Sequence, residues 1–244
     1  MSMVLSYREY GDIGTPVVLL HGLFGSAQNW DAIARRLAAN HPVYALDLRN
    51  HGNSPWSPSM TYSDLVDDTR GFIEQHDLKE TVVLGHSMGG KAAMLLALEH
   101  PDLVERLIVV DIAPVAYLDI ENFLAYTKTA PDIGRFSDAG AQLFLPQNLA
   151  FRNEHFDWRV NLSALIANID QLVDFPAAAF ERVYTGRTLF LYGSQSDHVH
   201  PEHHSAIYRL FPNAEIVVIP NASHWVHADQ PDLFVEKVLA FLAD

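Results

Sequence analysis

A G-x-S-x-G pattern directly after a β-branched run constrains the fold of this 244-residue chain more than any other feature. Residues 81–84 are typical of a strand, the next five are Gly85-His86-Ser87-Met88-Gly89, and the apolar residues 92–96 are typical of a helix. Such a strand–turn–helix lifts one side chain, here Ser87, above the end of a sheet. The outer glycines fit because the backbones in this turn approach too closely for a Cβ. The pattern predicts an α/β fold with Ser87 as its nucleophile.

Short apolar strands alternate with amphipathic helices on both sides of this turn, which predicts a mostly parallel, twisted sheet flanked by helices. The first helix is the clearest, because its apolar residues follow helical spacing from Trp30 to Ala38. The predicted strands are residues 4–10, 17–20, 43–47, 81–84, 107–111, 188–192 and 215–219. The other predicted helices are residues 61–76, 88–100, 201–211 and 231–243.

The chain changes character in its middle third. Strand-like runs are missing from residues 113–184, and prolines interrupt the helical segments there. We therefore predict a core of residues 1–112 and 185–244, interrupted by a helical cap insertion at residues 113–184. The aromatic residues of this cap are expected mostly to pack its own interior, with a few facing a substrate. They are Phe123, Tyr126, Phe136, Phe144, Phe151, Phe156 and Trp158.

A nucleophilic serine needs a base, and the base needs a group that orients it. Among 13 histidines, His224 lies between the last predicted strand and the last helix, where the chain order serine, acid, histidine places the base. His227 is the weaker alternative and is expected to be a satisfied surface histidine. Asp111 ends one predicted strand and Asp197 follows a later one. Both preserve this order, so both are candidates for the acid.

Acyl transfer also needs two backbone N–H groups that stabilise an oxyanion. Met88 follows the nucleophile at the start of a predicted helix, so its N–H is one expected donor. The second is expected in the glycine-rich loop His21-Gly22-Leu23-Phe24-Gly25, which follows the strand of residues 17–20. Leu23 is the preferred donor in this loop and Phe24 the alternative.

Charge and composition exclude several classes of partner. A formal charge of −14 argues against nucleic acid and anionic membranes, because both attract positive surfaces. The absence of cysteine removes thiol nucleophiles, disulfides and thiolate metal sites. His198, His200, His203 and His204 crowd together, but no H-E-x-x-H pattern completes a metal site, so neither metal nor cofactor is predicted. With no run of ~18 apolar residues and no signal-peptide pattern at the start, we expect a soluble cytoplasmic protein acting on a small molecule.

Taken together, the motifs resemble the α/β-hydrolase superfamily over the whole chain, and more narrowly the bacterial YbfF-type esterases. The segment Asp47-Leu48-Arg49-Asn50-His51-Gly52-Asn53-Ser54 and the serine turn carry the broader resemblance. Within the cap, only Asp157-Trp158-Arg159-Val160-Asn161 matches well. The narrower resemblance is carried by His21-Gly22-Leu23-Phe24-Gly25-Ser26, Arg49-Asn50-His51-Gly52, Gly85-His86-Ser87-Met88-Gly89-Gly90-Lys91, Val110-Asp111-Ile112-Ala113-Pro114-Val115 and His224-Trp225-Val226-His227-Ala228.

This resemblance implies a serine carboxylesterase or thioesterase for small to medium acyl groups, working through an acyl-enzyme and without a cofactor. In the superfamily the acid more often follows the later strand, at the position that Ser196 occupies here, with Asp197 one residue late. In the narrower group the acid follows the earlier strand, so Asp111 is preferred and Asp197 stays the alternative. Hydrolysis of an amide, a lactone or a carbon–carbon bond is a rival function on the same scaffold. A binding protein without catalysis is the rival from another class.

Overall fold

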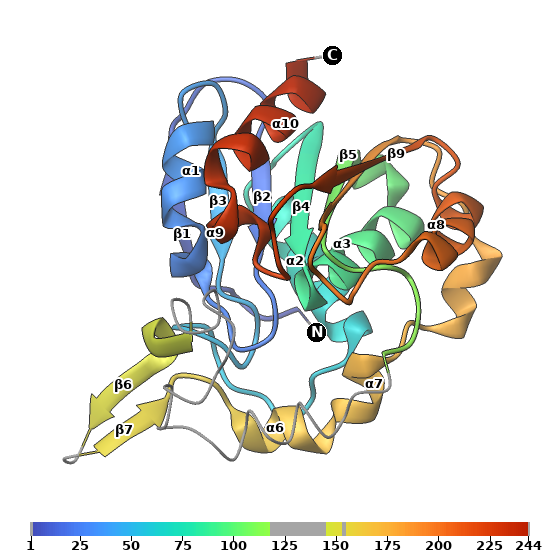
Figure 1. Cartoon of the computed structure of the whole chain (residues 1–244). Helices are drawn as coiled ribbons and strands as arrows, with labels where there is room; N and C mark the ends of the chain where they lie inside the picture. Colours follow the sequence, from blue (N-terminus) through green and yellow to red (C-terminus); the bar gives the residue numbers. More distant parts are fainter. Residues whose placement is uncertain (1, 118–144, 153–154, 244) are drawn as a thin grey trace.

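A seven-stranded sheet forms the centre of the molecule (Figure 1). The computed structural model describes residues 2–117, 145–152 and 155–243. The strand order is β1-β3-β2-β4-β5-β8-β9, and every neighbouring pair is parallel except β1 with β3. This confirms the predicted mostly parallel sheet. The strands are β1 (Tyr7–Tyr10), β2 (Val17–Leu20), β3 (Val43–Leu46), β4 (Thr81–His86), β5 (Val104–Val110), β8 (Arg187–Gly193) and β9 (Ala214–Ile219).

Helices cover both faces of the sheet because successive strand residues point to opposite sides. In β2, Val17 and Leu19 pack on the face covered by α1 (Asp31–Leu37) and α10 (Pro231–Ala243). The alternate residues Val18 and Leu20 face the second layer. That layer consists of α2 (Tyr62–Gln75), α3 (Met88–Glu99) and α8 (His204–Leu210). The two apolar cores position the loops at the carboxyl ends of the strands.

Most predicted elements are present with small shifts at their ends. The strand of residues 17–20 and the helix of residues 231–243 have the predicted bounds. The predicted first helix is divided into a 3-10 turn, η1 (Ala27–Trp30), and α1. The strand predicted to include Asp111 ends at Val110, because Asp111 has a φ of 52° that no extended strand allows.

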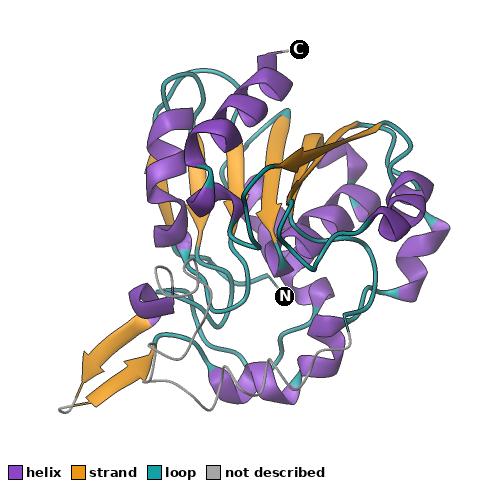
Figure 2. Cartoon of the chain, in the orientation of Figure 1, coloured by secondary structure: helices purple, strands orange, loops and turns teal. Residues whose placement is uncertain are grey.

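The chain between β5 and β8, residues 111–186, leaves the sheet, and we call it the β5–β8 segment. Its described helices are α6 (Leu162–Ala167), α7 (Ile169–Val173) and the 3-10 turns η4 (Leu145–Asn148) and η5 (Ala177–Glu181). It also contains an antiparallel hairpin of β6 (Leu149–Arg152) and β7 (His155–Trp158), which stands apart from the main sheet (Figure 2). The prediction of a segment without strands was therefore wrong here, since the alternation in residues 149–158 is too short to read as a hairpin.

Several residues of the predicted cap belong to the stretch 118–144, which the structure does not describe. Pro131 and the aromatic residues Phe123, Tyr126, Phe136 and Phe144 lie outside the described residues. Trp158 is described, and its ring packs 5.6 Å from that of Phe24 in the loop after β2.

The described part of the β5–β8 segment lies across the carboxyl ends of the strands (Figure 1). The buried Lys91 of α3 donates from Nζ to the carbonyls of Val173 (3.0 Å) and Asp174 (2.8 Å). The hydroxyl of Tyr62 donates to the carbonyl of Leu172 at 2.8 Å. These contacts hold the end of α7 against α2 and α3.

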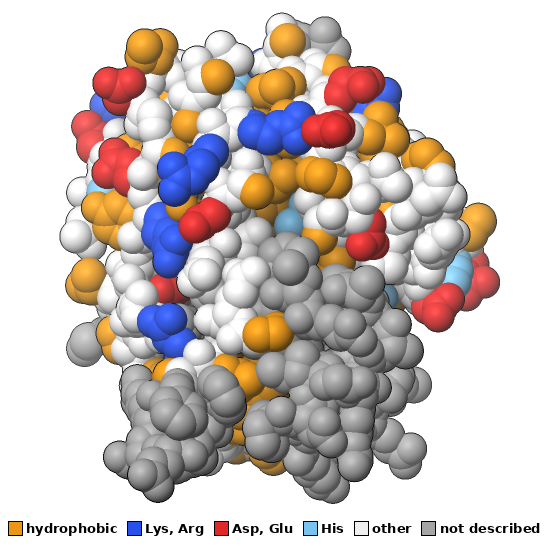
Figure 3. Space-filling model, turned by 60° about the vertical axis from the view of Figure 1, so that its left-hand side comes forward, with side chains coloured by type: hydrophobic (Ala, Val, Ile, Leu, Met, Phe, Trp, Pro, Cys, Tyr) orange, Lys and Arg blue, Asp and Glu red, His pale blue; other side chains and the backbone are white. Residues whose placement is uncertain are grey.

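The surface carries both signs of charge. On the face shown in Figure 3, basic side chains lie beside acidic ones. Ion pairs such as Arg8–Asp31 (2.7 Å) and Arg36–Asp232 (2.8 Å) join residues from different elements. In the described part of the chain, no helix has the length and apolar character that a bilayer crossing requires.

Candidate active site

Ser87 sits at a strained turn between β4 and α3. Its φ of 53° is one that residues other than glycine seldom adopt. The turn is held by a hydrogen bond from Ser87 N to the carbonyl of Val110 at 3.0 Å, which places it beside the end of β5. A Cβ on Gly85 would clash with the carbonyl of Gly89, and one on Gly89 would lie 2.5 Å from the carbonyl of Leu20. The glycine spacing is therefore required by close backbone contacts.

The loop after β2 lies against Ser87. A Cβ on Gly22 would be 3.1 Å from the Cβ of Ser87, so no larger residue fits between them. His21 braces this loop, because its Nδ1 donates to the carbonyl of Gly22 (2.7 Å) and its Nε2 accepts from Leu48 N (3.0 Å). The structure thus brings the loop that contains Leu23 beside the start of α3, where Met88 is the first residue.

His224 and Asp111 form a direct hydrogen bond at the same edge of the sheet. Nδ1 of His224 lies 2.7 Å from Oδ2 of Asp111, whose side chain is fully buried. The carboxylate also accepts from Gly193 N (3.0 Å) and from the hydroxyl of Ser196 (2.5 Å). Asp197 is exposed, and in the described part of the chain it makes no hydrogen bond to His224. Of the two candidate acids, Asp111 is the one that contacts the candidate base.

Two other histidines flank the ring of His224. The His198 ring stacks on it with centroids 3.8 Å apart and an interplanar angle of 18°. The His86 ring lies 4.5 Å away, and its Nε2 donates to the carbonyl of His224 at 2.9 Å. The candidate base is therefore enclosed between two imidazoles.

Asp111, His198 and His224 bring potential metal-ligand atoms within 4.8 Å of one another. Lone pairs on imidazole nitrogens point outward in the plane of each ring. The planes of His198 and His224 are nearly parallel and stacked, so these lone pairs do not converge on one ion. As arranged here, the three residues are poorly suited to hold a metal.

Burial sets the protonation states at this site. It lowers the pKa of His224 to about 3, so the imidazole is neutral and able to accept a proton at neutral pH. Burial raises the pKa of Asp111 to about 6, while hydrogen bonds from Ser196 and Gly193 act in the opposite direction. The carboxylate is therefore ionised at pH 7 and becomes protonated under mildly acidic conditions.

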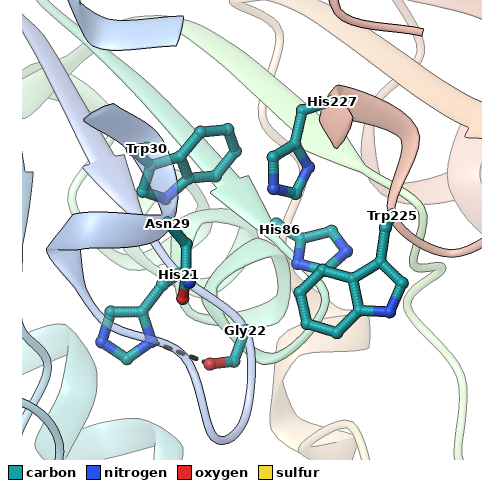
Figure 4. Close-up of a pocket in the computed structure, with 7 residues that line it drawn as sticks. All are labelled: His21, Gly22, Asn29, Trp30, His86, Trp225 and His227. Carbon is teal, nitrogen blue, oxygen red and sulfur yellow. Dashed lines mark hydrogen bonds between the residues drawn. The ribbon is translucent and has the colours of Figure 1, made fainter. Parts of the chain in front are cut away.

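His227 lies beside His86, with ring centroids 5.0 Å apart. It is buried, and its ring stacks on that of Trp30 with centroids 4.4 Å apart, so the expectation of a surface histidine was wrong. The hydrogen bond to Asp111 is made by His224, three residues earlier. A small pocket beside the loop after β2 is lined by His21, Gly22, Asn29, Trp30, His86, Trp225 and His227 (Figure 4).

Sequence reasoning gave no role to Ser196 or His198, and it treated His21 only as part of a motif. Ser196 was noted as the position where related chains more often carry the acid, and here its hydroxyl bonds to the acid that comes from β5. His198 was considered only as part of a histidine-rich stretch. The stacking that distinguishes it from His200 and His204 depends on how two distant loops meet, for which the sequence carries no short-range signal.

Comparison with known proteins agrees with the fold described above. The model of the alpha/beta hydrolase family matches residues 17–237. The chain is 43% identical to the sn-1-specific diacylglycerol lipase ABHD11 of Mus musculus, over 98% of this chain and 85% of the mouse protein. It is 31% identical to the esterase YbfF of Escherichia coli (strain K12), over 94% of each chain.

A solved structure described as a marine microorganism esterase superimposes with a TM-score of 0.89 at 33% identity. The match covers 98% of this chain and all of that chain. The chain therefore belongs to the alpha/beta hydrolase family, as an enzyme among that family's esterases and lipases.

Proposed function

We propose that this protein is a serine carboxylesterase in which Ser87 is the nucleophile, His224 the base and Asp111 the acid that orients it. The observation that carries the proposal is the 2.7 Å hydrogen bond between His224 and the buried Asp111. Ser87 stands at the neighbouring strand end, in a strained backbone conformation with a φ of 53°. A neutral imidazole with one nitrogen fixed on a carboxylate has its other nitrogen free to take a proton.

The reaction begins when Nε2 of His224 takes the proton of Ser87 as Oγ attacks the ester carbonyl carbon. The N–H groups of Met88 and Leu23 stabilise the resulting oxyanion, each by roughly 2.7–4 kcal/mol in the transition state. His224 then protonates the leaving alcohol as the C–O bond breaks, which leaves an acyl-enzyme. Water, deprotonated by His224, attacks the acyl carbon and releases the acid, and the proton returns to Ser87.

The β5–β8 segment supports the substrate side of the proposal. We infer that residues 113–184 form a cap inserted into a core of residues 1–112 and 185–244, since the described part lies across the strand ends. Its Trp158 and the loop residue Phe24 place apolar surface beside the loop after β2. This favours small to medium acyl esters, with acyl thioesters as a further substrate class. The cytoplasmic location and the absence of nucleic-acid or membrane partners stay predictions from the sequence.

The test is hydrolysis of p-nitrophenyl butyrate by the wild type, by Ser87→Ala and by Ser63→Ala. Ser63 is an exposed serine of α2 and serves as the matched control. We expect activity and labelling by a fluorophosphonate probe to vanish only in Ser87→Ala, with the label mapped to Ser87 by mass spectrometry. Equal rates in all three proteins, or no rate and no label in the wild type, would reject the proposal.

A second assay then decides between related reactions. A butyryl thioester, a butyryl anilide and a lactone are compared with the ester, using the ratio of kcat/KM values. An ester or thioester preference agrees with the proposal. If amide or lactone hydrolysis dominates and still depends on Ser87, the proposed catalytic residues stand and the proposed substrate class is wrong.

A further inference from the structure

His198 is partly exposed, yet its ring packs against the ring of the candidate base. It lies in the loop after β8, with 37% of its side chain exposed. Its ring nevertheless stacks on His224 at a centroid distance of 3.8 Å. Its Nδ1 is 3.9 Å from Oδ2 of Asp111, which is too long for a hydrogen bond. The contact with the candidate base is thus made through the face of the ring and not through a nitrogen.

The backbone of His198 is fixed on both sides of the residue. Its N–H donates to Oγ of Ser196 at 3.2 Å, and Ser196 in turn donates to Asp111. Its carbonyl accepts from the hydroxyl of Tyr117 at 2.6 Å, and that hydroxyl also accepts from Ala113 N at 2.8 Å. The ring of Tyr117 lies 5.6 Å from that of His198. The stacked ring is therefore held by the loop that binds the acid and by the beginning of the β5–β8 segment.

The two faces of His224 are held in different ways. On the His86 side, the ring contact is accompanied by a hydrogen bond to the main-chain carbonyl of His224, which fixes the backbone. On the His198 side, the contact is a near-parallel stack that restricts rotation of the imidazole itself. Without this stack, the bond to Asp111 and the tilted ring contacts with His86 and Trp225 remain, and none of these lies flat against the imidazole.

We propose that His198 is a positioning residue for the catalytic base, and that the flat face of its ring keeps His224 directed from Asp111 toward Ser87. This inference rests on the proposed function of Ser87, His224 and Asp111. An aromatic stack of this kind changes the population of the correct orientation by about threefold to tenfold. The role requires a planar ring and does not require a nitrogen at this position.

The test compares His198→Ala, His198→Phe and the wild type, with His200→Ala as a matched histidine control from the same loop. With p-nitrophenyl butyrate, we expect His198→Ala to lower kcat about threefold to tenfold with an unchanged KM. His198→Phe retains the ring and is expected to restore most of kcat. His200→Ala is expected to leave both constants at the wild-type values, because its ring contact is with His203. Thermal unfolding of each variant verifies that it is folded.

A proton NMR measurement separates this inference from the proposed function. The low-field resonance of the His224 Nδ1–H, assigned by its loss in His224→Gln, reports the bond to Asp111 without any substrate. We expect it to persist in His198→Phe and to be lost to solvent exchange in His198→Ala. The inference is overturned if His198→Ala keeps both the resonance and the wild-type kcat. It is also overturned if kcat is as low in His198→Phe as in His198→Ala. If the wild type hydrolyses no ester, the proposed function fails and the resonance alone decides the role of His198.

Discussion

The loops around Ser87 and the β5–β8 segment are held in place by different kinds of contact. Around Ser87, main-chain groups at the ends of adjacent strands bond to one another, as between Ser87 N and the carbonyl of Val110. The described part of the segment is attached largely by hydrogen bonds that involve side chains. Some come from the core, as those of Lys91 and Tyr62 do, and others from the segment, as that of Asn161 to Asn50 does. The first arrangement follows from the register of the sheet. The second depends on individual side chains, so a single substitution can remove a contact that attaches the segment.

The largest effect is expected when the orienting carboxylate is lost. Asp111→Asn removes the charge that fixes the tautomer of His224, and such a change lowers kcat by about 10⁴-fold. Asp197→Asn is the matched control, because Asp197 is exposed, and we expect it to stay within about twofold of the wild type. Steady-state kinetics with p-nitrophenyl butyrate measure both. Similar losses in the two variants would mean that the site depends on the loop after β8 as much as on the end of β5.

A pH profile tests the same residue in the wild type. Burial raises the pKa of Asp111 to about 6, so the carboxylate binds a proton at a higher pH than an exposed aspartate does. The active form has Asp111 ionised, and kcat/KM is therefore expected to be constant above about pH 6 and to fall about tenfold per pH unit below it. Circular dichroism at each pH confirms that the protein is folded. A profile that stays flat to pH 4.5 contradicts this assignment.

Replacing a core side chain that holds the segment tests the second kind of contact. Lys91→Met keeps the volume but leaves the carbonyl of Asp174 without its donor, at a cost of about 1–3 kcal/mol in the free energy of unfolding. Urea denaturation measures this loss, and limited proteolysis shows whether cleavage begins in the β5–β8 segment. Lys79→Met, at an exposed lysine, is expected to leave the free energy unchanged. An unchanged stability in Lys91→Met would show that other contacts, such as the bonds of Tyr62 to Leu172 and of Asn161 to Asn50, are enough to hold the segment.

The smallest effect is expected where the segment meets the loop after β3. Asn161 donates from Nδ2 to Oδ1 of Asn50 (3.0 Å), and its own Oδ1 caps α6 by accepting from Ala164 N (3.3 Å). Asn161→Ala removes both contacts and is expected to cost about 0.5–2 kcal/mol. Asn161→Ser retains a helix-capping oxygen and loses the bond to Asn50. The cost of Asn161→Ser therefore gives the contribution of docking, and the difference between the two variants gives that of capping. Thermal unfolding measures both, and equal costs would assign the whole effect to docking.

The parts of the molecule that the sequence predicted well are those fixed by short-range patterns. The parallel sheet followed from apolar runs, and the turn at Ser87 followed from two glycines that the backbone contacts require. Asp111 and His224 were named because each ends or follows a strand, and their contact agrees with the preferred acid. The hairpin β6–β7, the burial of His227 and the stacking of His198 on His224 were missed. Each of these depends on which distant segments meet, and neither periodicity nor spacing reports that.

The bonds that Lys91 and Tyr62 make have a consequence for protein engineering. Their acceptors in the segment are the carbonyls of Leu172, Val173 and Asp174, and every amino acid supplies a carbonyl. The bonds themselves therefore do not depend on which side chains stand at these positions, although the side chain of Leu172 is buried in the core. A designer who keeps Lys91, Tyr62 and Leu172 could change exposed side chains nearby, such as those of Gln171 and Asp174, on the same backbone path. Such changes would leave the catalytic edge of the sheet as it is.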